Sequence, residues 1–364
     1  MANSFFPSRT ITLYMGRAFL ARTFAVLFAL VLVLQSLDLL GESGDVLGYP
    51  GNGSAELWTY VSLRMPQIIS LFLPFSVLLG TVITLATLNQ NSEVVSMKAS
   101  GLSAHQILAP LIVASLLVAA LSFAFNDRIV ARASTTLTRW QKAEYGPLPK
   151  DVKSPANVWV RDGDKLIHAE KVSGRGAATR LTNVTVFNRT GGELVDITRS
   201  PSAVPFQNGL QLAKAEQFIV ATGKRQELGT IIVGQTIQAE QFTLASVQPE
   251  GLSFVELAAA IEDLQNAGRP TSALEAGLWH KISGPLSSIL MPLLGAVAGF
   301  GIARSGRLFV RAVVGMALGF AYFVADNFGL AMGNLGAYPP LLAAWGPFFL
   351  FLLIGETVLI QTEE

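Results

Sequence analysis

Six stretches of the chain are long and apolar enough to cross a lipid bilayer as helices. An α-helix rises about 1.5 Å per residue, so the ~30 Å hydrocarbon core of a membrane takes roughly 20 mostly apolar residues. Because lipid offers no hydrogen-bond partners to an open strand, stretches of this kind are predicted to be helical. They cover residues 18–40, the interval between Arg64 and Glu93, and residues 107–125, 282–303, 308–330 and 339–360.

The charged side chains are concentrated between the third and the fourth stretch. Only 14% of all residues are charged, against about 25% in an average soluble protein, which argues against an ordinary soluble enzyme. Residues 127–275 hold 17 of the 26 basic and 16 of the 25 acidic side chains. We therefore predict two membrane parts, residues 1–126 and 276–364, with three helices each, separated by a polar domain at 127–275.

Short β-rich runs recur in the polar domain and are separated by turn sequences such as Asp162-Gly163-Asp164. This pattern lacks helical periodicity and predicts an all-β sandwich or jelly roll. A helix closes the domain, because Ser253 and Glu256 have the spacing of a capping box and Gly268 and Pro270 stop the helix. The predicted strands cover residues 157–160, 165–172, 181–187, 194–198, 210–220 and 230–237. Leu257, Ile261 and Leu264 are predicted to share one face of the helix.

Basic residues in the short loops predict the orientation in the membrane. They precede the first stretch and lie in alternate loops, whereas residues 41–56 and 331–338 contain none. The positive-inside rule then places both termini in the cytoplasm and residues 127–275 on the outer side. The basic residues concerned are Arg9, Arg17, Arg22, Lys98, Arg304, Arg307 and Arg311.

Several classes of function are excluded by composition and motif. A net charge of +1 lacks the basic footprint of a nucleic-acid binder, and the absence of cysteine excludes thiol catalysis and cysteine-based metal sites. The three histidines lie in unrelated contexts, and neither H-E-x-x-H nor G-x-S-x-G occurs, so no catalytic or metal site is predicted. No phosphate-binding loop occurs either. Any ATP hydrolysis must therefore be performed by another protein, and no cofactor is expected on this chain.

Residues 91–101, between the second and the third stretch, predict a short cytoplasmic helix. Asn91 or Ser92 is able to cap it, Glu93 suits its positive end, and Gly101 suits a left-handed closing residue. One interpretation is a connector on the membrane surface. The other is a docking element for a cytoplasmic partner.

A few polar residues remain in the membrane parts. The carboxylates Asp38, Asp326 and Glu356 either reach water at the headgroup level or contact another helix or a substrate path. Arg64, at the outer start of the second stretch, is either an interfacial anchor or a cation that meets an anionic amphiphile. Small residues four apart favour close helix packing, within the chain by default or between subunits. These pairs are Gly295/Gly299, Gly315/Gly319 and Gly329/Gly333.

The whole pattern resembles the LptF/LptG (YjgP/YjgQ) family of lipopolysaccharide export permeases. The most specific match is residues 92–101 (SEVVSMKASG), which are similar to the family's coupling helix. Supporting matches are residues 14–17 (YMGR), 158–163 (VWVRDG) and 278–281 (LWHK). The WVRDG segment and Asp38 resemble the LptG branch more than LptF. The coupling positions matched are Ser92, Glu93, Val94, Met97, Lys98 and Gly101.

The resemblance implies an ATP-driven transporter in the bacterial inner membrane. Two such permeases, an LptF-like and an LptG-like subunit, pair and dock a dimeric LptB-like ATPase, which uses ATP and Mg²⁺. Spans 1 and 5 form lateral gates for lipopolysaccharide leaving the outer leaflet. The periplasmic β-jellyroll then passes the lipid to a bridge together with the single-span protein LptC.

One departure from the family concerns the outer half of the first span. LptG-type members often carry lysines there, whereas this chain has Gln35, followed by Gly41 and Glu42. A differently charged lipid, or compensation by Arg64 or by the partner subunit, are the alternatives. The candidate substrate or gate residues are Gln35, Asp38, Arg64 and Asp326.

Two other functions fit the same architecture. One is a membrane-anchored periplasmic binding or scaffold protein, and the other is an exporter of a different lipid-linked cargo. Glu93 argues against the scaffold, because a scaffold has no reason for an acidic cytoplasmic helix.

Overall fold

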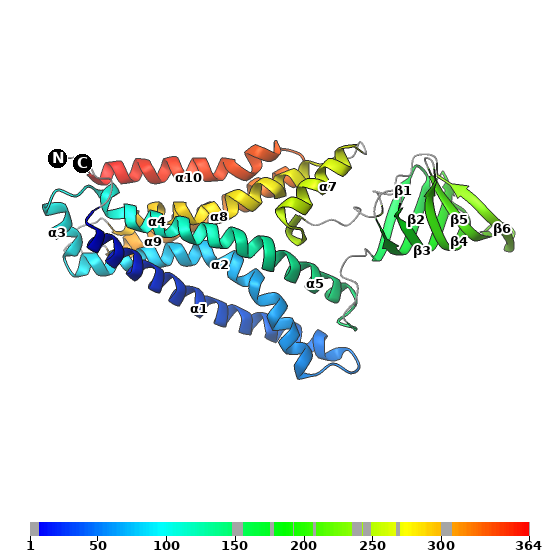
Figure 1. Ribbon diagram of the computed structural model, residues 1–364, viewed down its shortest axis with the longest axis horizontal. Helices are drawn as coiled ribbons and strands as arrows, with labels where there is room; N and C mark the ends of the chain where they lie inside the picture. The colour runs from blue at the N-terminus through cyan, green and yellow to red at the C-terminus, as the bar shows by residue number, and fades with distance from the viewer. Residues whose placement is uncertain are drawn as a thin grey trace. The chain divides into compact units, whose positions relative to one another are not determined.

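The structure is a computed structural model, and the chain in it divides into two compact units. One unit comprises Met1–Leu148, Pro249–Ala258 and Ser272–Glu364, and the other comprises Pro149–Gln248 and Ala259–Thr271. The first is helical, and the second contains the β-sheet (Figure 1). The structure describes residues 7–147, 156–174, 178–191, 193–206, 209–234, 242, 249–266, 270–299 and 308–363.

Long helices build the helical unit. A π-helical turn, Asn126–Val130, joins α4 to α5. The start of α1, the short helix α3 and the end of α10 lie at the same end of this unit (Figure 1). The α-helices of the described chain are α1 (Arg9–Gly48), α2 (Ser54–Gln90), α3 (Glu93–Ala99), α4 (Ala104–Phe125), α5 (Ala131–Lys142), α7 (Phe254–Asn266), α8 (Ser272–Gly299), α9 (Leu308–Asn334) and α10 (Pro340–Glu363). The first part of α7, up to Ala258, belongs to the helical unit and the rest to the second unit.

Five segments of the described chain are long and apolar enough to cross a membrane. They are Arg9–Gly48, Ser54–Gln90, Ala104–Lys142, Val313–Asn334 and Pro340–Gln361, and they confirm five of the six predicted stretches. The fourth stretch falls on α8, which is not among the five. Glu275, His280 and Lys281 lie in the first turns of α8, before the predicted stretch begins at residue 282. The predicted end of that stretch, up to Ala303, and the basic residues Arg304 and Arg307 lie outside the described residues.

Glycines set the spacing of the helices. A Cβ added to Gly80 of α2 would lie 2.9 Å from the Cα of Thr23, so α1 and α2 approach backbone to backbone. A Cβ on Gly295 of α8 would lie 2.8 Å from Thr81 Cγ2 of α2. On α9, Gly319 lies against Leu78 of α2. Gly329 and Gly333 of the same helix both lie against Ala343 of α10. Gly315 is buried, and Gly299 is the last described residue of α8.

Buried apolar side chains from seven helices, including Val94 of α3, form the core of the helical unit. Phe19 of α1 and Leu78 and Leu85 of α2 are fully buried in it. Further core residues come from α4, α8, α9 and α10, including Leu108, Leu294, Tyr322 and Phe351. The core is stabilised by many closely packed side chains together and not by any single contact.

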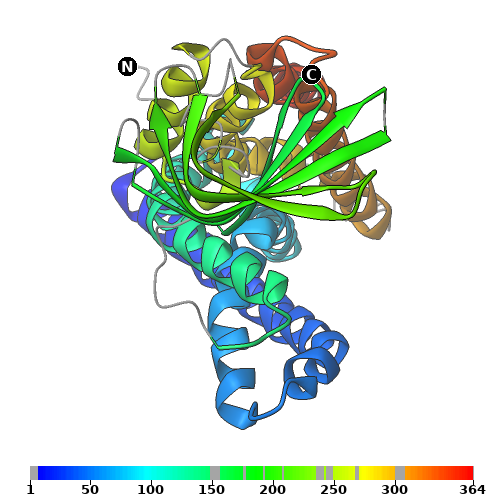
Figure 2. The same ribbon diagram turned by 90° about the vertical axis from the view of Figure 1, so that its right-hand side faces the viewer.

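The second unit holds one six-stranded sheet, in which every strand pairs antiparallel with its sequence neighbour. The sheet is strongly curved (Figure 2). Alternate residues, such as Val158, Ile167 and Val186, form a buried core on one face. The strands are β1 (Ala156–Asp162), β2 (Lys165–Ser173), β3 (Arg180–Thr190), β4 (Glu193–Phe206), β5 (Gly209–Ile219) and β6 (Lys224–Val233).

The all-β prediction for this segment is confirmed, whereas the jelly roll is not, because the described strands follow one another as a simple meander. Two strand boundaries were also predicted wrongly. β4 continues past Thr198 through two prolines, and Ser200 Oγ lies within hydrogen-bond distance of the carbonyl oxygens of Ser202 and Ala213 in this part. β6 begins at Lys224, where polar residues hide the strand pattern. Predicted strand residues 235–237 lie outside the described residues.

The helix that closes the polar segment is confirmed as α7, which begins at Phe254 after a capping box. Ser253 N donates to Glu256 Oε2 at 3.0 Å, and Glu256 N donates to Ser253 Oγ at 3.3 Å. Leu257, Ile261 and Leu264 are buried along one face, as predicted. Gly268 lies outside the described residues, and Pro270 follows the end of the helix.

Candidate functional site

The short helix α3 lies between two residues with left-handed backbone. Ser92 has φ of 60° and Gly101 has φ of 87°, which turns the chain sharply on both sides of α3. The prediction for Gly101 is confirmed. The prediction of a side-chain cap is wrong for Ser92, whose hydroxyl makes no cap hydrogen bond. Asn91 instead donates a hydrogen bond from its side-chain amide nitrogen Nδ2 to Glu93 Oε1.

One face of α3 is anchored, and the other is exposed. Val94 is 3% exposed and belongs to the core of the helical unit, and Met97 packs against that core. Val95 is 58% exposed, and Ser96 and Ala99 are exposed beside it. The helix thus presents a small apolar surface to its surroundings while its other side is held by the bundle.

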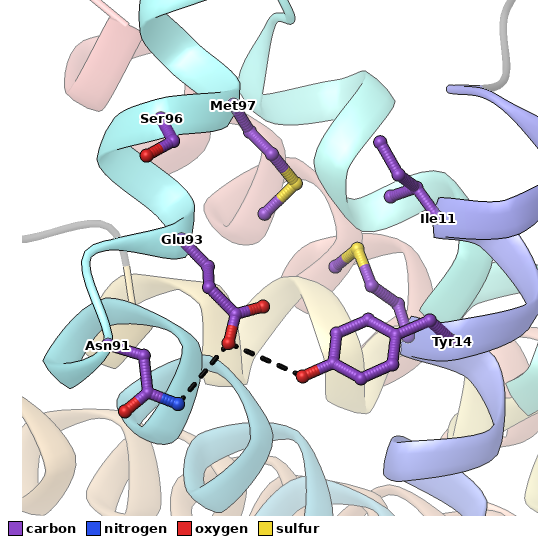
Figure 3. Close-up of a pocket in the computed structure, with 7 residues that line it drawn as sticks. Ile11, Tyr14, Asn91, Glu93, Ser96 and Met97 are labelled. Carbon is purple, nitrogen blue, oxygen red and sulfur yellow. Dashed lines mark hydrogen bonds between the residues drawn. The ribbon is translucent and has the colours of Figure 1, made fainter.

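The carboxylate of Glu93 points toward α1 and not away from the protein (Figure 3). Its Oε1 accepts a hydrogen bond from the Tyr14 hydroxyl at 3.3 Å and one from Asn91 Nδ2 at 3.2 Å. An open pocket of about 280 Å³ lies between the two helices. It is lined by Ile11, Tyr14, Met15, Asn91, Glu93, Ser96 and Met97.

Tyr14 was not predicted to belong to this site. The sequence did contain a sign of its importance, because Tyr14 is the first residue of the motif at 14–17 that resembles the family. Nothing in the sequence indicates that this motif lies beside a helix that begins 79 residues later.

A second polar group joins α1 to α2. Arg64 Nε and Nη2 donate to Asp38 Oδ1 at 3.0 Å and 2.9 Å, and the Tyr60 hydroxyl donates to Asp38 Oδ2 at 2.6 Å. Arg64 Nη1 donates to Gln67 Oε1 at 2.7 Å. Gln35, one turn before Asp38, is 7% exposed, and its side-chain amide has no hydrogen-bond partner among the described residues. The structure thus brings Asp38 and Arg64 together as an ion pair.

The other two membrane carboxylates also contact a neighbouring helix. Asp326 Oδ2 of α9 lies 3.0 Å from His280 Nε2 of α8, and Glu356 Oε2 of α10 lies 3.2 Å from His105 Nε2 of α4. The His280 ring lies against Gly284, where an added Cβ would come within 3.2 Å of the ring. Of the two alternatives for these carboxylates, the structure favours contact with another helix.

Within the described residues, no group of three or more histidine or acidic side chains is arranged to hold a metal ion. The polar contacts described above instead occur as small separate groups between helices, such as Asp38 with Arg64 and Tyr60, and Asp326 with His280. Their chemistry is suited to positioning helices, because each group joins two different helices through directional contacts.

Comparison with known proteins decides the family. The sequence profile of the family described as lipopolysaccharide export system permease LptF/LptG matches residues 13–361. The chain belongs to this family. The LptG permease protein of Escherichia coli (strain K12) is 24% identical over 365 residues, which cover 98% of this chain and 99% of that protein. The LptG permease protein of Haemophilus influenzae is 23% identical over 368 residues, which cover 95% and 96%.

As a member of the LptF/LptG family, the chain is a permease of the lipopolysaccharide export system. It is a multi-pass membrane protein and a transporter subunit, not a catalytic enzyme. The predicted resemblance is thereby confirmed. Both relatives named here are LptG proteins, in agreement with the branch that the WVRDG segment indicated.

Proposed function

We propose that α3 is the element through which a separate cytoplasmic ATPase drives this permease. The supporting observation is the two-sided character of α3: Val94 is held in the core of the bundle while Val95 is exposed. The sequence has no phosphate-binding loop, so the energy comes from a partner. That partner, an LptB-like ATPase dimer, binds the ATP and Mg²⁺, and this chain binds no cofactor.

The proposed docking face combines apolar and polar positions. Val95 supplies apolar surface at its centre, and Ser92 and Ser96 flank it. Lys98, in the last turn of α3, complements the negative end of the helix, and Glu93 in the first turn complements the positive end. The pocket beside Glu93 is open, and the hydrogen bonds from Tyr14 and Asn91 to its carboxylate both use Oε1, so we propose that Oε2 meets a cation of the ATPase.

The proposed substrate path lies at the rim of the helical unit. In the most apolar part of α1 only 17% of the residues are buried, and in that of α9 22%. The corresponding share is 56% in α2 and in the segment that contains α4. Phe28 and Leu40 of α1 are 70% and 76% exposed. Apolar helices with so little cover are expected to face lipid or a second permease subunit. An LptF-like partner that pairs along α1 and α9 would enclose the lipopolysaccharide between the two subunits.

The proposed direction of transport follows from the orientation in the inner membrane. The start of α1, α3 and the end of α10 lie at one end of the helical unit, which agrees with cytoplasmic termini (Figure 1). The sheet unit is then periplasmic. In the full transporter we propose that it forms a jelly roll that passes lipopolysaccharide from the outer leaflet to a bridge, together with an LptC-like single-span protein.

The proposed headgroup contacts differ from those of family members with lysines in span 1. Arg64 is neutralised by Asp38, and Gln35 is uncharged. We therefore propose that the partner subunit supplies most of the positive charge for the lipid phosphates. Gln35, Asp38 and Arg64 then shape the outer end of the cavity, while Asp326 holds α9 to α8.

Copurification with the ATPase tests this function. Val95→Asp and Glu93→Lys are expected to abolish recovery of the ATPase and lipid-stimulated ATP hydrolysis, because both place an unfavourable charge on the docking helix. Val255→Asp, at a valine of α7 that is 74% exposed, is the matched control and should behave as wild type. If both α3 variants retain the ATPase at the wild-type level, α3 is not the coupling element.

A further inference from the structure

Two short sequence motifs that are far apart in the chain meet at one pocket. Residues 14–17 and residues 92–101 had each matched the family separately. In the structure, the first residue of the one motif and the carboxylate of the other share a hydrogen bond, from the Tyr14 hydroxyl to Glu93 Oε1 (Figure 3). The role proposed for α3 uses only the second motif.

The remaining residues of the first motif fix the inner end of α1. Met15 is fully buried in the core, and Ile11 packs against that core. A Cβ added to Gly16 would lie 4.0 Å from the carbonyl oxygen of Pro110 on α4, so α1 passes close to that backbone. Tyr14 is the position of this motif that faces α3.

Two kinds of contact hold α3, apolar packing and a directional hydrogen bond. Val94 and Met97 attach α3 to the core through apolar contacts, which are not directional. The hydrogen bond from Tyr14 is directional, and its acceptor is a carboxylate, which strengthens hydrogen bonds. At 3.3 Å it is long for an O–H···O bond, so its contribution is to orientation more than to stability.

We propose that Tyr14 is a positioning residue that ties α1 to α3, so that the two helices move together when a partner acts on α3. This inference rests on the proposed function of α3. α1 is the least buried of the five candidate membrane helices. Within the described chain α1 packs mainly against α2 and α4, and the Tyr14 hydrogen bond links its first turns to α3. A movement of α3 is therefore passed through Tyr14 to the helix proposed as a gate.

The first test measures the distance between the two helices. The chain has no cysteine, so Leu13→Cys and Ser100→Cys introduce one spin-label pair at two exposed positions. In the otherwise wild-type permease we expect a narrow distance distribution that stays narrow when ATP is added to the full complex. Tyr14→Phe is expected to broaden it, because only the hydroxyl is lost. Glu93→Gln keeps an acceptor oxygen and should retain the narrow distribution, whereas Glu93→Ala should not.

The second test measures coupling in the full complex in lipid nanodiscs with lipopolysaccharide. In Tyr14→Phe, the ATPase should still copurify, while the ratio of lipid-stimulated to basal ATP hydrolysis falls by roughly two- to tenfold, the factor that one net hydrogen bond contributes. Tyr338→Phe is the matched control, because it removes the hydroxyl of a tyrosine that is 41% exposed in the turn before α10.

The inference is overturned if Tyr14→Phe matches Tyr338→Phe in both the distance distribution and the stimulation ratio. Failure of the proposed function has a different signature, namely ATPase recovery that is indifferent to Glu93→Lys. The distance measurement on the permease alone remains informative in that case, because it reports the link between α1 and α3 without the ATPase.

Discussion

Arg64 of α2 donates two hydrogen bonds to the same carboxylate oxygen of Asp38 on α1, from Nε at 3.0 Å and from Nη2 at 2.9 Å. The side chain of Asp38 is 19% exposed and that of Arg64 is 36% exposed. The pair lies toward the end of α1 that is remote from Tyr14. α1 is therefore joined to its neighbours by polar contacts near both ends, from Tyr14 to Glu93 at one end and at Asp38 and Glu42 toward the other.

Removal of either member of this pair is expected to lower the stability of the permease. Arg64→Ala leaves a mostly buried carboxylate without its cation, which should cost about 1–2 kcal/mol, below the value for a fully buried pair because Arg64 is partly in contact with solvent. The measurement is denaturant-induced unfolding in detergent. The double variant with Asp38→Ala should cost less than the sum of the two single variants, and strict additivity would show that the two side chains are not coupled.

The same variants distinguish a structural pair from a headgroup site. If Arg64 bound lipid phosphate, Arg64→Gln would reduce copurified lipopolysaccharide even when protein stability is restored. We expect the lipid content to follow the stability of the protein, and the charge-swapped pair Asp38→Arg with Arg64→Asp to recover both.

The close approach of α1 and α2 at Gly80 predicts a strong effect of one methyl group. Gly80→Ala would place Cβ 2.9 Å from the Cα of Thr23, where backbone and not a flexible side chain must move. We expect a loss of about 1–3 kcal/mol in the free energy of unfolding, as for overpacked cores. Gly44→Ala is the control, because its added Cβ meets nothing within 4 Å in α1. That variant should be neutral or stabilising by up to about 1 kcal/mol from helix propensity.

Tyr145 predicts a dependence of stability on alkaline pH. Its hydroxyl donates to Glu42 Oε2 at 2.5 Å, and its ring packs edge-on against Trp140. Burial, together with this hydrogen bond, raises the pKa of Tyr145 from 10.0 to about 12. The folded state therefore holds this proton more tightly than the unfolded chain. The stabilising contribution is fully present below pH 10 and is lost as the pH rises toward about 12.

The measurement is thermal unfolding between pH 8 and about pH 12, the range spanned by the Tyr145 shift, for wild type and Tyr145→Phe. The wild-type advantage over the variant should be constant up to pH 10 and should shrink above it. If the difference between wild type and variant does not change with pH across this range, the folded state does not hold the Tyr145 hydroxyl proton more tightly than the unfolded chain.

Local patterns accounted for most secondary structure. The helical segments were predictable because a membrane-spanning helix needs a long apolar run, and such a run is visible without knowledge of its neighbours. α7 was predictable in the same way, since its capping box involves residues three apart. β4 was underestimated because Pro201 and Pro205 are strand-ending signals in isolation, whereas pairing with β3 and β5 carries the strand through them.

The contacts of the candidate site were not predictable to the same degree. Glu93 was identified from its place in a short cytoplasmic helix, but its orientation toward Tyr14 was not. Asp38 and Arg64 were considered singly. Asp38 was a carboxylate that either reached water at the headgroup level or contacted another helix or a substrate path, and Arg64 was either an interfacial anchor or a cation for an anionic amphiphile. Their distance depends on how α1 and α2 pack, which in turn depends on Gly80 and Thr23.

The amino-acid sequence by itself determined the apolar helices, the β-rich insert, the short helix after α2 and the membership of the LptF/LptG family. These are properties of local composition and periodicity, in which each residue interacts mainly with the solvent or with residues a few positions away. Only the tertiary structure decided which polar groups pair: Tyr14 with Glu93, Arg64 with Asp38, and His280 with Asp326. The physical reason is that a hydrogen bond forms only within about 3 Å and at a suitable angle, and helix packing sets these conditions between distant segments.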